Sequence, residues 1–157
     1  GMNAADNARV CGSLQWVTGR LFELLGGWVE RVDEPADAIW LAALSRRLGS
    51  HVAAFAEIMP DAVLLTNECA VVPAGPALVE AFGELVDTSD PVGVAAALTG
   101  RLTRECGAVL NECVPHTDGS LQRAVEFLMI DLASADTKAP KSVAEVAETF
   151  RMVAPVV

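Results

Sequence analysis

The residues of this chain that could hold a metal ion in a helical interior are one histidine and two glutamates, His51, Glu105 and Glu112. Imidazole and carboxylate groups are common ligands of iron and manganese, and helical bundles usually supply them as Glu-x-x-His pairs. Neither histidine completes that pair, because the residue three positions earlier is leucine for His51 and cysteine for His116. The sequence therefore offers three candidate ligands without the motif that would join them into a two-metal centre.

Two interpretations of these residues stay open from the sequence. His51 and Glu105 both fall in line with apolar residues at helical spacing, so both are expected to face inward, with Glu112 two turns beyond Glu105. One interpretation is an atypical metal site. The other is structural: His51 is a core histidine bonded to a carboxylate or a carbonyl group. Glu105 would then pair with Arg20, Arg101 or His51, because an isolated buried carboxylate is costly. We favour the structural interpretation.

Long amphipathic helices must position these side chains. Apolar residues recur at three- and four-residue steps over most of the chain, and acidic residues followed by proline mark two of the helix starts. A loose terminus is expected up to about Cys11, in which Gly1 before Met2 has the pattern of a tag-cleavage remnant. The predicted helices cover residues 13–31, 33–60, about 77–86, 90–115 and 117–136, with a short final helix from residue 142.

Residues 60–90 separate the second long helix from the third, and most of this segment has no helical period. A tight antiparallel turn needs far fewer residues, so the segment is long enough to travel the length of the helices and return. The prediction is an all-α protein, a four-helix bundle with one long crossover between its second and third core helices, which is the ferritin-like arrangement. A plain up-and-down bundle with an inserted loop is the alternative.

Several stretches of the chain resemble a known family. They are the run LFELLGGWV at 21–29, the turn DEP at 33–35, the helix end AEIMP at 56–60, the run DGSLQRA at 118–124, and Asp131. Over residues 14–136 the chain is similar to a bacterial branch of the ferritin-like superfamily that lacks the usual Glu-x-x-His ligands. The resemblance implies one helical-bundle domain over residues 1–157 and a di-metal site that has been lost.

Composition excludes some partners and favours others. The 157 residues carry a formal charge of −10, and Arg46 and Arg47 form the only adjacent basic pair, so neither nucleic acid nor an anionic membrane surface is an expected partner. The apolar content is 52%, which favours a homodimer that covers surplus apolar surface. The four cysteines contain no C-x-x-C and are expected to be free thiols of a cytoplasmic protein.

The resulting functional hypothesis is a non-catalytic structural, binding or regulatory module without a cofactor. The first alternative is a metal-dependent oxidoreductase or hydroxylase that holds iron or manganese at an atypical site around His51 and Glu105. The second is a carrier of an apolar small molecule, with Phe55 and Trp40 as the walls of its pocket.

Overall fold

The computed structural model describes residues 1–61, 63–136 and 156–157, and within these residues the regular structure is helical, without a strand. The final helix predicted from residue 142 lies outside the described part. No helix described here combines the length and the apolarity that a bilayer span demands. The α-helices are α1 (Ala4–Trp28), α2 (Pro35–Ile58), α3 (Pro76–Leu85), α4 (Pro91–Glu112) and α5 (Pro115–Asp136), with short 3₁₀ turns at Val29–Arg31 and Val63–Leu65.

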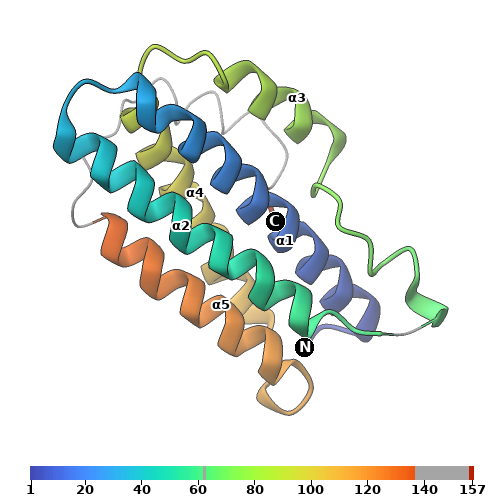
Figure 1. Ribbon diagram of the computed structural model, residues 1–157. Coiled ribbons are helices and arrows are strands. Elements are labelled where there is room, and N and C mark those ends of the chain that lie inside the picture. The colour runs from blue at the N-terminus through green and yellow to red at the C-terminus, as the bar shows by residue number, and fades with distance from the viewer. Residues whose placement is uncertain (62, 137–155) are drawn as a thin grey trace.

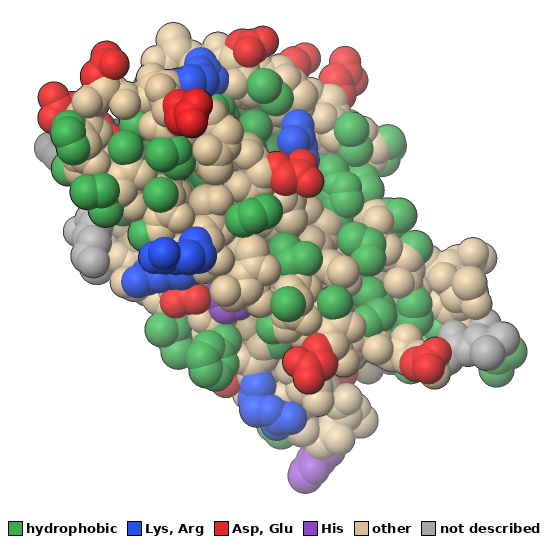
Figure 2. All heavy atoms as spheres, viewed as in Figure 1, with side chains coloured by type: hydrophobic (Ala, Val, Ile, Leu, Met, Phe, Trp, Pro, Cys, Tyr) green, Lys and Arg blue, Asp and Glu red, His purple; other side chains and the backbone are tan. Residues whose placement is uncertain are grey.

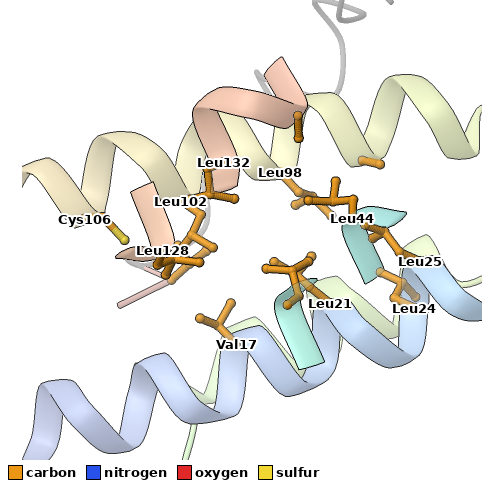
Figure 3. Packing of buried hydrophobic residues seen from close by; sticks show 14 of the residues in the cluster. Val17, Leu21, Leu24, Leu25, Leu44, Leu98, Leu102, Cys106, Leu128 and Leu132 are labelled. Atoms are coloured by element: carbon orange, nitrogen blue, oxygen red, sulfur yellow. The ribbon is translucent and has the colours of Figure 1, made fainter. Parts of the chain in front are cut away.

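The four long helices lie side by side, and α3 lies outside them (Figure 1). α1 and α2 form one antiparallel pair and α4 and α5 another, with α2 packed against α5. The predicted apolar stripes are the faces that meet in the middle. Figure 3 shows Leu21 of α1, Leu44 of α2, Leu102 of α4 and Leu128 of α5 pointing into a shared interior. Each leucine is at most 2% exposed, and full burial of such a side chain contributes about 1.5–3 kcal/mol to stability.

The connection from α2 to α4 runs back along α1. Near its beginning the backbone of Ala70 lies against Gly12, in the N-terminal half of α1. Near its end the carbonyl oxygen of Val86 accepts a hydrogen bond from Nε1 of Trp28 at 3.0 Å and another from Arg31. The connection therefore passes from one end of α1 to the other, and α4 begins at the end where α2 begins.

The largest difference from the predicted helix boundaries is at the start of the chain. α1 begins at Ala4, not at residue 13, so the expected loose terminus is instead its first two turns. The side chain of Asn3 caps this helix by accepting a hydrogen bond from the backbone N–H of Asp6 at 2.8 Å. Ala8 is fully buried, and Asn7 donates to the carboxylate of Asp118 at 3.0 Å. The early start is therefore held by a local cap and by a contact with α5.

Pro115 begins α5, whereas the sequence pattern suggested that it ends the preceding helix. The carboxylate of Asp118 reaches back and accepts the backbone N–H of Val114, four residues earlier, at 2.9 Å. Asp118 is 2% exposed and also accepts from Asn7. Its pKa lies below the usual value for aspartate, chiefly because of the hydrogen bond from Val114. Ionised Asp118 thus ties the start of α5 to the start of α1.

This bond predicts a pH-dependent contribution to stability. Because the pKa of Asp118 is lowered by folding, its stabilisation is present above the unfolded-state pKa and is lost as the pH falls through the folded-state value. Asp118→Ala should lower the free energy of unfolding at pH 7 by about 1–2 kcal/mol, the usual cost of removing a capping side chain. Urea titrations from pH 7 to pH 3 should show this difference shrinking. A difference that stays constant with pH would contradict the assignment.

The contact between Gly12 and the connection predicts opposite effects for two glycine substitutions. A Cβ atom at Gly12 would lie 2.2 Å from the carbonyl oxygen of Ala70, so Gly12→Ala should destabilise the protein by about 1–3 kcal/mol. Gly107 in the interior of α4 has no heavy atom within 4 Å of such a Cβ, so Gly107→Ala should stabilise by about 0.5–1 kcal/mol. Chemical denaturation measures both. A Gly12→Ala variant as stable as the wild type, or more stable, would show that the connection does not press on α1.

Candidate functional site

His51 lies on the side of α2 that faces α5, and it is hydrogen-bonded to Asp131. The distance from Nε2 of His51 to Oδ2 of Asp131 is 2.6 Å. A carboxylate can only accept, so the imidazole N–H is the donor. His51 is 5% exposed, whereas the side chain of Asp131 is 31% exposed and reaches the surface. The prediction that His51 is a core histidine bonded to a carboxylate is confirmed.

A groove with a volume of about 580 Å³ runs over this pair between α2 and α5. Ala54, Ile58 and Phe127 give it apolar walls, and Glu57 and Arg123 place one charge of each sign beside it. Because the groove is open to solvent and its deepest polar group is already hydrogen-bonded, it offers contact area for a partner and few free polar groups.

The hydroxyl groups beside the pair are engaged elsewhere. Ser50 Oγ donates to the carbonyl oxygen of Arg46 at 3.3 Å, and Ser120 Oγ accepts from Arg123 at 3.5 Å. Nucleophilic catalysis requires a hydroxyl or thiol within hydrogen-bond reach of the basic nitrogen. In the described residues neither serine makes that bond, so the histidine and the aspartate form a pair and not a triad.

Glu105, on α4, uses both carboxylate oxygens in structural bonds. Oε2 accepts from Nε of Arg101, one turn earlier, at 2.8 Å. Oε1 accepts from the backbone N–H groups of Val156 and Val157 at 2.7 and 3.2 Å. Arg101 was one of the three partners expected from the sequence. Val156 is buried in the core, so the carboxylate anchors a distant segment of the chain against α4.

The structure does not assemble the three candidate ligands. His51 is bonded to Asp131, Glu105 to Arg101 and the 156–157 backbone, and Glu112 is exposed in the last turn of α4. Throughout the part of the chain that the structure describes, no group of three or more His, Cys, Asp or Glu residues is placed to hold a metal ion. The geometry thus gives the atypical metal site no support within these residues.

The cysteines are free, as expected. Cys11 and Cys106 are fully buried, and burial raises the pKa of Cys11 to about 11 and that of Cys106 to about 12. The thiolate is the nucleophilic form, and at neutral pH these two residues are almost entirely protonated. Cys69 and Cys113 are partly buried. The two buried thiols act as small apolar residues of the core.

The two aromatic residues named in the carrier hypothesis both make structural contacts, and Trp40 also lines a hollow of about 290 Å³ between α2 and α5. Phe55 is fully buried in the core. Trp40 is nearly buried, and its indole Nε1 donates to the carbonyl oxygen of Ala135 at 3.0 Å. This bond ties the start of α2 to the end of α5, which gives Trp40 a structural role.

Sequence reasoning missed two partners, Asp131 and the Val156–Val157 backbone. The first left a signal, because Asp131 lies in line with Ala124 and Leu128 and was therefore on an inward-facing stripe. Its pairing with a histidine 80 positions away required the relative placement of two helices. The Val156–Val157 backbone left no signal in the sequence, because every residue except proline has a backbone N–H group.

Comparison with known protein-family models, with curated proteins and with solved structures gave no match to this chain. The functional argument therefore rests on the geometry of the described residues.

The pair between α2 and α5 predicts a loss of stability when its carboxylate is removed. Asp131→Ala leaves the nearly buried Nε2–H of His51 without its acceptor, which should lower the free energy of unfolding by about 1–3 kcal/mol. Glu57→Ala in the same groove is the matched control, because Glu57 is exposed and should change stability by less than about 0.5 kcal/mol. Urea denaturation at pH 7 measures both. Equal effects would mean that the bond contributes nothing.

Proposed function

We propose that this protein is a non-catalytic binding module with a ferritin-like four-helix bundle, in which the di-metal site has been lost. The four long helices and the long connection between α2 and α4 are the features that support this bundle. The proposal includes the homodimeric state and excludes a resident metal cofactor.

One observation carries the proposal: the two inward-facing candidate ligands are held apart, each by structural bonds to a different part of the fold. His51 is held by Asp131, and Glu105 is held on both oxygens. A retained transition metal normally has three or four protein ligands. A metal ion at Glu105 or at Nε2 of His51 would have to break a bond that joins two parts of the fold. Within the described residues, no group of three or more ligand-capable side chains is placed to hold a metal ion.

The binding role rests on the surface between α2 and α5. This surface combines the groove over His51 with exposed apolar side chains, among them Phe127 and Ile130 of α5. Exposed apolar clusters rimmed by charged residues are typical of interaction sites. A carrier of an apolar small molecule would need an enclosed apolar cavity, and the groove is open instead.

Metal content tests the loss of the metal site. Protein purified without chelator is offered Fe(II), Mn(II) and Zn(II), desalted, and analysed by inductively coupled plasma mass spectrometry. The proposal predicts far less than one metal ion per chain, with no change in His51→Ala. His116→Ala, in an exposed residue, is the control for adventitious binding. Stoichiometric iron or manganese that disappears in His51→Ala and persists in His116→Ala would overturn the proposal.

A further inference from the structure

Among the α-helices, α2 and α5 carry the most exposed large apolar side chains, while less exposed ones lie on α1 and α3. Ile39 of α2 and Phe127 and Ile130 of α5 are 69%, 69% and 64% exposed, compared with 52% for Val79 of α3. Phe127 and Ile130 are three residues apart and therefore lie on the same face of α5. Figure 2 shows hydrophobic side chains gathered over α5, next to acidic and basic ones. We call Phe127 and Ile130 the α5 ridge.

The ridge borders the groove between α2 and α5. Phe127 belongs to both, because it forms a wall of the groove as well as part of the ridge. Ile39 lines a second hollow further along the same helix pair, beside Arg47. A projecting apolar ridge and a partly apolar groove thus lie next to each other on one face, which is the arrangement that a self-complementary surface requires.

The charges of this face differ from those of the chain as a whole. Two arginines, Arg47 and Arg123, and two acidic residues, Glu57 and Asp131, line its two hollows. The formal net charge of these four side chains is zero. The chain carries −10, so two copies repel each other over most of their surfaces. Two copies that approach through the α2–α5 face avoid this repulsion locally, and each presents charges of both signs to the other.

We infer that the partner of the α2–α5 face is a second copy of this chain. In a two-fold arrangement the α5 ridge of each copy fills the groove between α2 and α5 of the other, and the charged residues beside the groove form the rim. The inference deepens the proposed binding function by naming its partner.

The α5 ridge supplies the centre of the apolar contact that a dimer needs, and not the whole of it. An aromatic side chain can bury about 150–250 Å², and two ridges supply two phenylalanines and two isoleucines to one central cluster. A stable interface buries about 800 Å² on each partner, with an apolar core and a polar rim. The remainder would come from Ile39 and from the small residues of α2 that line the groove.

Size-exclusion chromatography with multi-angle light scattering, followed by sedimentation equilibrium, tests the inference on the whole chain. The wild-type protein should be a dimer at micromolar concentration. Phe127→Glu should raise the dimer dissociation constant about 30-fold or more, as expected for a central contact residue. Val79→Glu makes the same change at an exposed apolar position of α3, outside this face, and should leave the dimer intact.

Ile130→Glu is a second variant on the ridge and guards against a folding defect in the first; circular dichroism confirms that each variant is helical. A monomeric wild-type protein would overturn the inference, as would a wild-type dimer that both ridge variants leave unchanged. Dissociation by Val79→Glu to the same degree would also overturn it. A monomeric wild-type protein would also contradict the homodimeric state in the proposed function, whereas a dimer that both ridge variants leave unchanged would overturn this inference alone. Neither result bears on the loss of the metal site, which metal content tests separately.

Discussion

The need of buried polar groups for hydrogen-bond partners shapes this fold more than any other constraint. An unpaired polar group in an apolar interior costs about 1–3 kcal/mol, and no buried side-chain nitrogen or oxygen in the described residues lacks a partner. Many of the bonds run between helices. Ser45 of α2 donates to the carbonyl oxygen of Phe22 on α1, while Trp40 and His51 bond to Ala135 and Asp131 on α5. Leucine packing drives the association, and these bonds fix how far each helix slides along its neighbours.

The same bonds explain why His51 and Glu105, whose side chains could bind a metal ion or take part in catalysis, have structural roles in our account. Histidine and glutamate are rare in apolar interiors unless they are paired. His51 pairs with a carboxylate across a helix interface, and Glu105 holds both an arginine and the backbone of a distant segment. In each case the fold orients the side chain, through Nε2 of His51 and through both carboxylate oxygens of Glu105. The surface left for function is the α2–α5 face, where apolar side chains remain uncovered.

Local patterns predicted the helices well, because the period of apolar residues and the Pro–acid caps are encoded in adjacent residues. The cap at Asp90 is an example, since its carboxylate accepts from Gly93 three positions later, as the pattern required. The start of α1 rests on a local cap at Asn3, whose signal is present in the sequence, and on a bond between Asn7 and Asp118, which are 111 positions apart and whose pairing the sequence does not show. Arg101 could be named as a partner of Glu105 because it is one turn away. Asp131 could not be named for His51, since that needs the packing of two helices.

The most direct test of the central claim is an NMR spectrum of the histidine rings. The chain has two histidines, so protein with ¹⁵N-labelled histidine gives two ring patterns, and the exposed His116 is an internal control. Zn(II) is added in steps up to one equivalent per chain. Our account predicts that the ring nitrogen signals of His51 stay unchanged and that they shift in Asp131→Asn, which alters the partner of Nε2. A shift of the wild-type Nε2 signal of His51 on addition of Zn(II) would show that the nitrogen is free to bind metal and would contradict the account.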